Sequence, residues 1–218
     1  MTLNPALTTA DLIDIVAKEC KARSYWFLSP TVGKPFDIFL FGVRDASNPD
    51  TWNDALGCIY RTTQDGPLQL QLWKGTTDPG RNALLRPPNP AGTAVVAPGQ
   101  HRAVWTIGLH RGRPAFVQNR PIPVLRDTDR DGNIDPASPA VAGVYGINGH
   151  DAYKDGLQAV GEASEGCMVW WSHADHTEAL KLGQAQQKSL GLSSFSFTLF
   201  DVREVPEVYP LLAVVRGS

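Results

Sequence analysis

Few cysteines and no long apolar run mark this 218-residue sequence, which contains three cysteines and no Cys-x-x-Cys pair. An odd cysteine count without such pairs argues against a disulfide framework and against a zinc ribbon, so at least one thiol is expected to be free. No stretch approaches the roughly 20 apolar residues that span a bilayer, and no basic segment followed by an apolar run opens the chain. We therefore expect synthesis in the cytoplasm without a signal peptide, and no membrane segment.

A bias toward one sign of charge is also lacking, since 20 Lys and Arg residues oppose 22 Asp and Glu residues for a net charge of −2. The basic residues are scattered, whereas nucleic-acid-binding proteins concentrate them into a surface that neutralises phosphates. Nucleic acid is therefore not expected as a partner. Without internal repeats or an obvious linker, a single domain over residues 1–218 is the simplest organisation, with the proline-rich segment 86–90 as an alternative boundary.

Two stretches of the sequence have helical patterns. Thr8 and Asp11 have capping-box spacing, and apolar residues then recur at helical spacing over residues 9–23, with Cys20 on the core side. Residues 1–35 are thus predicted to be an N-terminal helical extension. A second helix is predicted to begin after Ser172 and to end at Gly191.

Short apolar or alternating runs, each bounded by turn residues, fill most of the remaining chain. They cover residues 36–43, 55–61, 67–73, 93–98, 102–110, 114–118, 143–148 and 195–202. The hydrophobic content of 42% is ordinary for a globular core. These patterns predict a β-rich fold, mainly β and of the α+β class, with a peripheral N-terminal helix.

Cys167 has a sequence context that differs from that of a core cysteine. It follows Gly166, which permits turn geometry and close backbone approach, and it precedes a strand-like run. A free thiol is mostly protonated at neutral pH, so a nucleophilic cysteine needs an imidazole nearby. His150, 17 residues upstream, is the candidate base, because two strands joined by the polar loop 151–163 would carry both residues to the same end of a sheet.

The segments around these two residues resemble the L,D-transpeptidase catalytic domain family, in its divergent, often phage-associated branch. The matching segments are Gly146-Ile147-Asn148-Gly149-His150 and Ser164-Glu165-Gly166-Cys167-Met168-Val169, and the likeness covers roughly residues 70 to 171. The sequence departs from the main family pattern at Glu165, where the motif carries a second histidine.

The resemblance implies an L,D-transpeptidase-like β-sandwich, with a catalytic body over about residues 65–205 and a helix after the catalytic cysteine. It implies that Cys167 attacks a carbonyl of bacterial peptidoglycan stem peptides, with His150 as general base and later as acid. Ser164 would orient the imidazole or hold the turn, and the backbone N–H groups of Gly166 and Cys167 would stabilise the oxyanion. The residues expected to bind substrate are Glu165, Trp170 and Asn148. No cofactor is required for this chemistry.

The same resemblance suggests a lytic or wall-remodelling enzyme, either an L,D-peptidase or carboxypeptidase or an L,D-transpeptidase. With Glu165 in place of the histidine, hydrolysis is better supported than transfer to an amine acceptor. Such an enzyme would act on the cell wall after release or after delivery by another route. The alternatives are a non-catalytic, calcium-stabilised cell-wall-binding or virion module of the same fold, and a zinc-dependent amidase.

Each of these alternatives depends on a possible metal site, one for calcium and one for zinc. Carboxylates at positions 1, 3, 5 and 9 and a glycine at position 6 resemble an EF-hand loop, which suggests structural calcium. The candidate ligands are Asp127, Asp129, Asp131, Asn133 and Asp135. Position 12 is Ser138 instead of glutamate, so a plain Asp- and Gly-rich turn is the competing interpretation. Zinc would use His173 and His176 together with Cys167.

Overall fold

The computed structural model describes residues 7–28, 34–134 and 138–217. Eight strands pair in a closed barrel, in the order β1 (Phe39–Arg44), β11 (Ser194–Asp201), β5 (Gly99–His110), β6 (Arg113–Gln118), β9 (Gly149–Asp151), β10 (Met168–Trp170), β3 (Gln69–Thr76) and β2 (Asp54–Tyr60). Two pairs of neighbouring strands, β1 with β11 and β9 with β10, are parallel, and the other pairs are antiparallel. The prediction of a β-rich fold is confirmed.

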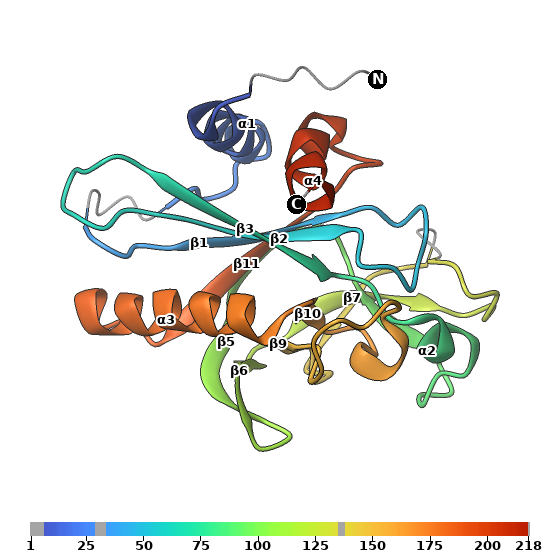
Figure 1. Cartoon of the computed structure of the whole chain (residues 1–218). Coiled ribbons are helices and arrows are strands. Elements are labelled where there is room, and N and C mark those ends of the chain that lie inside the picture. The colour runs from blue at the N-terminus through green and yellow to red at the C-terminus, as the bar shows by residue number, and fades with distance from the viewer. Residues whose placement is uncertain (1–6, 29–33, 135–137, 218) are drawn as a thin grey trace.

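A second, smaller sheet lies beside the barrel. It contains β4 (Thr93–Val96), β7 (Ile122–Asp127) and β8 (Val141–Gly143), all antiparallel. Its strands come from segments on both sides of the long β5–β6 hairpin. The sheet therefore brings residues 93–96, 122–127 and 141–143 together next to β9 and β10 (Figure 1).

The two predicted long helices are present with the predicted caps. In α1 (Thr9–Ala22) the Thr8 side chain accepts a hydrogen bond from the Asp11 N–H. In α3 (His173–Leu190) Ser172 caps the first turn, and Gly191 ends the helix in the left-handed conformation. Four further elements were not predicted: α2 (Arg81–Leu85), α4 (Tyr209–Arg216) and the 3₁₀ turns η1 (Gly161–Ala163) and η2 (Pro206–Val208).

Helices cover β1, β2 and β3 on both faces (Figure 1). On one face α1 and α4 bury a cluster that includes Cys20 and Phe41, and on the other α3 packs against a cluster that includes Trp105 and Trp170. Cys20 and Cys58 are fully buried, and Cys20 lies on the core side of its helix as predicted. Within the described ranges, no helix is both long and apolar enough to cross a membrane.

The predicted strand over residues 143–148 is wrong. β8 ends at Gly143 and β9 begins only at Gly149. Between them the Gln118 side chain replaces a neighbouring strand, because its Oε1 accepts hydrogen bonds from the N–H groups of Tyr145 and Ile147, at 3.0 and 2.8 Å. Because Gln118 accepts these backbone hydrogen bonds, Tyr145 and Ile147 need no neighbouring strand, and both line a cavity.

Candidate active site

His150 and Cys167 lie on neighbouring parallel strands. In the β9–β10 pair, His150 stands opposite Val169, and Cys167 comes immediately before β10. The Met168 N–H donates to the Asn148 carbonyl at 2.9 Å, which fixes the start of the pair. Both His150 and Cys167 line one cavity of about 190 Å³. The structure thus brings the two predicted residues to one site.

The turn before Cys167 depends on Gly166. Its φ is +122°, and a Cβ at this position would lie 2.2 Å from the Ala94 carbonyl oxygen. Ser164 Oγ accepts from the Gly166 N–H at 3.1 Å and donates to the Cys167 carbonyl at 2.9 Å. Ser164 therefore holds the turn, the second of its two predicted roles. The Gly166 N–H is already used in this turn, which leaves the Cys167 N–H as the backbone candidate for the oxyanion.

The Cys167 thiol is protonated at rest. Its side chain is partly exposed, its Sγ lies 3.4 Å from the Asn148 nitrogen, and it donates weakly to the Gly146 carbonyl at 3.5 Å. Burial of the sulfur raises the pKa of Cys167 to about 11, and the charge of Glu165 acts in the same direction, while the Asn148 N–H opposes both. A cysteine in this state needs a base before it can act as a nucleophile.

The His150 ring has the tautomer that such a base needs. Its Nδ1 lies 2.7 Å from the carbonyl oxygen of Asp151, which can only accept, so Nδ1 carries the proton and Nε2 is the basic nitrogen. Burial lowers the pKa of His150 to about 4, and the neighbouring His110 and His176 lower it further, against the Asp151 carbonyl and carboxylate. The imidazole is thus neutral and ready to accept a proton at neutral pH.

A second imidazole, His110 at the end of β5, also lines the cavity. Its ring stacks on His150 with centroids 4.8 Å apart, and its Nδ1 lies 2.9 Å from Asn148 Nδ2, an amide donor. Nδ1 is therefore the acceptor, and the neutral ring carries its proton on Nε2. No sequence signal indicated a role for His110, because its position before the Arg111–Gly112 turn has no characteristic spacing relative to His150.

Asn148, predicted to bind substrate, has a structural role instead. It is buried, its Oδ1 accepts from the Gln118 N–H at 2.9 Å, and its Nδ2 donates to His110. Both ends of the amide are engaged by protein atoms. Asn148 thus ties β6 and His110 to the segment facing Cys167, and it positions the site without contacting the cavity.

Of the other predicted substrate-binding residues, Glu165 lines the cavity and Trp170 does not. Trp170 is 1% exposed, and its ring packs near Trp73 and Phe116 in the core, with centroids 6.2 and 6.1 Å apart. Side chains alternate along a strand, and β10 directs Met168 and Trp170 into the same core. The prediction that Trp170 lines a substrate groove is therefore wrong.

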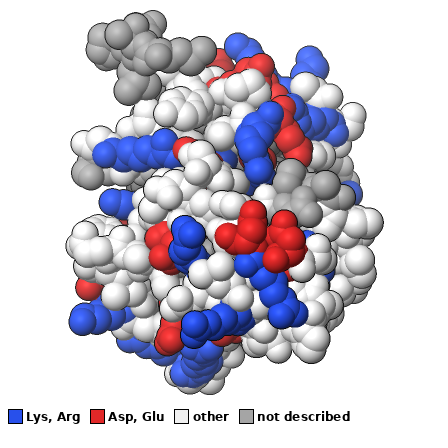
Figure 2. Space-filling model, turned by 90° about the vertical axis from the view of Figure 1, so that its right-hand side faces the viewer, with Lys and Arg blue, Asp and Glu red and all other residues white. Residues whose placement is uncertain are grey.

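Charged side chains of both signs surround the cavity. Arg111 and Arg126 line it together with Glu162 and Glu165. A second cavity, of about 360 Å³, shares Arg111, both glutamates and Pro88 with the first, so the two adjoin and are together called the groove. The face that carries α2 and the small sheet shows blue and red side chains interspersed (Figure 2).

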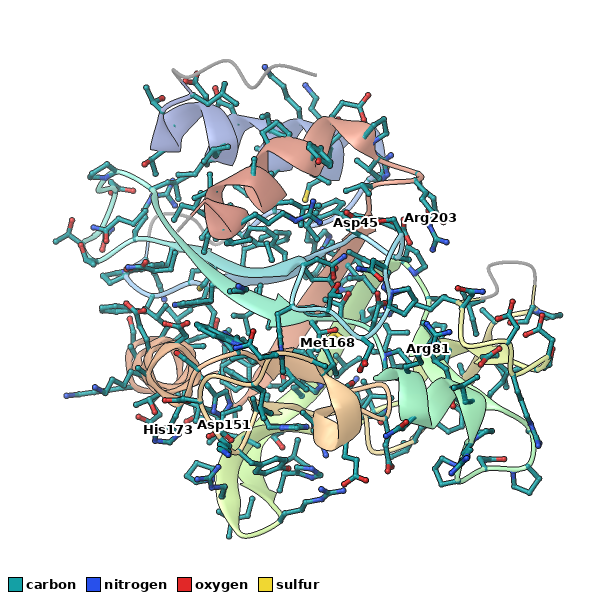
Figure 3. All side chains as sticks on the ribbon, turned by 45° about the vertical axis from the view of Figure 1, so that its right-hand side comes forward. Asp45, Arg81, Asp151, Met168, His173 and Arg203 are labelled. Atoms are coloured by element: carbon teal, nitrogen blue, oxygen red, sulfur yellow. The ribbon has the colours of Figure 1, made fainter. Side chains whose placement is uncertain are left out.

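The residues proposed for zinc do not meet. Asp151 and His173 lie side by side in Figure 3, at the far end of β10 from Met168, the residue that follows Cys167. His173 Nδ1 contacts Asp151 Oδ2 at 2.8 Å, and His176 Nε2 lies 3.2 Å from the Gly149 carbonyl. Among the described residues, no group of three metal-ligand side chains includes either histidine or Cys167.

The predicted calcium ligands are brought together in part. Side-chain oxygens of Asp127, Asp129 and Asp131 lie within 4.8 Å of one another. Asn133 donates its Nδ2 to Asp131 at 2.9 Å, and Asp135 lies outside the described residues. This cluster is separate from the pair of Cys167 and His150.

Comparisons of the chain with models of known protein families, with curated protein sequences and with solved structures found no match.

Proposed function

We propose that this chain is a cysteine-dependent acyl-transfer enzyme of the L,D-transpeptidase type, acting on peptidoglycan stem peptides. The observation that carries the proposal is the pair of Cys167 and His150 at one cavity, with Nδ1 of the imidazole held by a carbonyl and Nε2 left basic. The L,D-transpeptidase-like sandwich and the limits of a catalytic body over about residues 65–205 belong to the same proposal.

The chemistry follows from the two neutral groups. Cys167 Sγ attacks the carbonyl carbon of the scissile peptide while His150 Nε2 takes the thiol proton. The tetrahedral oxyanion is stabilised by the Cys167 N–H and by the Nε2–H of His110. Collapse breaks the C–N bond, and the imidazolium gives its proton to the leaving amine, which leaves a thioester on Cys167. Water or an amine then attacks the thioester, with His150 again accepting the proton, and the thiol is restored.

The charges of the groove suit the proposed substrate. Stem peptides carry carboxylates and amines within a few bonds of each other, and the groove offers Arg111 and Arg126 for the former and Glu162 and Glu165 for the latter. Glu165 replaces the motif histidine with an acceptor-only group. We accordingly propose hydrolysis, in wall lysis or remodelling, as the main reaction, with amine transfer as the minor one.

Mass spectrometry of muropeptides released from purified sacculi tests this proposal. The wild-type protein is expected to shorten or cut stem peptides, and Cys167→Ala is expected to abolish this change while remaining folded. Cys20→Ala is the matched control, since Cys20 is a buried residue of α1 and does not line the cavity. Unchanged muropeptides with the wild-type protein, or equal turnover by Cys167→Ala, would contradict the proposal.

A non-catalytic, calcium-stabilised wall-binding or virion module is the second candidate, and one observation favours it. The raised pKa of Cys167 leaves few thiolates at neutral pH, as in a cysteine with no catalytic role. Co-sedimentation with sacculi separates the two functions. Under the module hypothesis, wild-type and Cys167→Ala proteins bind equally and neither changes the muropeptides.

A further inference from the structure

Asp127 is a buried carboxylate that its surroundings do not satisfy. It ends β7, its side chain is 1% exposed, and neither carboxylate oxygen has a hydrogen-bond partner within the described chain. Burying an ionised carboxylate without partners is strongly unfavourable, so such groups normally pair with a cation or coordinate a metal. This unsatisfied carboxylate indicates that a ligand is needed beside it.

The loop after β7 brings two more carboxylates to the same point. The Asp129 and Asp131 side chains are exposed, and their oxygens lie within 4.8 Å of each other and of an Asp127 oxygen. Positive φ angles of +58° at Arg130 and +86° at Gly132 curl the chain around this point. Ile134, buried in the third core cluster with Leu84 and Leu125, anchors the far side of the loop.

The charge of Arg81 acts on Asp131, but one cation does not balance the three carboxylates of the cluster. Burial, the Asp129 side chain and the charges of Asp129 and Asp131 raise the pKa of Asp127 to about 6, and the nearby Arg130 N–H, which does not reach hydrogen-bond geometry, only partly opposes this. Hydrogen bonds from Asn133, and the charge of Arg81 at the start of α2 (Figure 3), hold the pKa of Asp131 below its usual value. The Arg130 guanidinium is engaged elsewhere, because it donates to the Pro90 carbonyl at 2.9 Å.

We propose that Asp127, Asp129 and Asp131 bind one Ca²⁺ ion. Ligands that are carboxylate oxygens alone suit a hard cation, and their alternate spacing with glycine at the sixth position matches a loop that wraps calcium. Asp127 supplies the buried side of the site, while the two exposed aspartates leave room for the backbone carbonyls or waters that complete 6–8 oxygens. The proposal is independent of the catalytic function.

The ion would stiffen one wall of the groove. Asp127 pairs with Thr93 in the small sheet, and the preceding pair joins Arg126 to Ala94. Arg126 and Ala94 both line the cavity of Cys167, and the Ala94 carbonyl is the atom against which Gly166 packs. Calcium at the end of β7 therefore holds the strand pair that supports the cysteine turn.

Isothermal titration calorimetry of the chelator-treated full chain with CaCl₂ tests the proposal, with thermal unfolding as a second readout. One equivalent of Ca²⁺ is expected to bind and to raise the melting temperature, with MgCl₂ at the same concentration giving a smaller shift. Asp129→Asn with Asp131→Asn, two exposed changes that keep the fold, is expected to weaken binding about tenfold or more, because affinity follows the ligand charge.

Two further variants complete the test. Asp127→Asn is expected to abolish saturable binding, and if it does not fold, the exposed double variant decides. Asp14→Asn, which removes an exposed carboxylate on α1, is the matched control and is expected to bind as the wild type does. No heat and no thermal shift for the wild type at millimolar Ca²⁺, an equal response to Mg²⁺, or unchanged binding by the double variant would overturn the proposal.

Discussion

The three cysteines differ in solvent access, although burial is the main cause of the raised pKa of each thiol. Cys20 and Cys58 are fully buried in apolar clusters, and burial raises the pKa of each thiol, to about 12 for Cys20. Cys167 alone is partly exposed, at the cavity, and its pKa is about 11. A reagent that reacts only with thiolate is therefore expected to modify Cys167 before the other two cysteines, and to do so slowly.

Alkylation with iodoacetamide measures this difference. We expect one label on the native protein, on Cys167, and three labels in guanidinium chloride. The labelling rate of Cys167 at pH 7 should be well below that of a free cysteine and should rise with pH toward 11, because only the thiolate reacts. Rapid labelling at pH 6 would instead indicate a resting thiolate paired with imidazolium, in conflict with the pKa directions of both residues.

Substituting the histidines tests the roles of the two rings. His150→Gln removes the base and is expected to lower kcat by about 10²–10⁴, measured as muropeptide release. His110→Phe keeps the stacked ring but loses the Nε2–H proposed as an oxyanion donor and the Nδ1 that holds Asn148, so a loss of about 10²–10³ in kcat with little change in KM is expected. His173→Asn, at the opposite end of β10, is the control. Equal rates for His150→Gln and wild type would contradict the assignment.

The sequence could predict the pairing of His150 with Cys167 because both residues flank one local loop and the glycine turn has a recognisable pattern. It could not predict His110 or the orientation of Trp170. The first reaches the site through a long β hairpin, and the second depends on the phase of side-chain alternation in β10, which an all-apolar run does not reveal.

At the scale of elements, the turn into β10 and the loop after β7 shape the site. Gly166→Ala places a Cβ against the Ala94 carbonyl at a φ of +122°. We expect a loss of about 1–3 kcal/mol in the free energy of unfolding and loss of muropeptide release, measured with urea titrations and the sacculus assay. Gly112→Ala is the matched control, because it also has positive φ, +79°, but open space around it. Similar losses for the two variants would show that backbone strain alone, and not the packing of the turn, matters.

Elements with strong local signals were predictable, and those stabilised by distant side chains were not. The capped helices α1 and α3 carry their start signals in Thr8 and Ser172. The run 143–148 is as apolar as a strand, yet Gln118 from another hairpin takes its backbone hydrogen bonds. Such a partner, far away in sequence, leaves no trace in local periodicity.

At the scale of the whole molecule, three buried histidines link stability to pH. Burial lowers the pKa of His101, His150 and His176 to about 4, below the unfolded value near 6.5. The unfolded chain therefore binds more protons between pH 6.5 and 4, so these residues make the fold less stable as the pH falls through that window. Asp78 acts in the opposite direction, because burial raises its pKa to about 8.

A single variant isolates one histidine from these opposing effects. His176→Gln keeps an amide donor toward the Gly149 carbonyl but cannot titrate. We expect the variant to lose less stability than the wild type between pH 7 and pH 4.5, by about 1–3 kcal/mol, in urea unfolding at the two pH values. Identical pH dependence in both proteins would show that His176 is not held neutral by the fold.

The β-rich class followed from alternating runs, but the closure of the barrel did not. Closure needs the parallel pairing of β1 with β11, which joins Leu40 to Phe197 near opposite ends of the chain. Both strands are almost wholly buried, so neither shows which neighbour it pairs with. Local patterns determine strands, whereas this pairing is set by the packing of the complete core.

The most direct test of the account is an intact-mass measurement of the protein after brief incubation with a stem tetrapeptide and an acid quench. A thioester on Cys167 is predicted, seen as a mass increase equal to the acyl fragment and mapped to the peptide that contains Cys167, and absent from Cys167→Ala. Release of the terminal residue with the acyl group on another residue, or no adduct and no cleavage at any concentration, would contradict the claim that this thiol is the nucleophile.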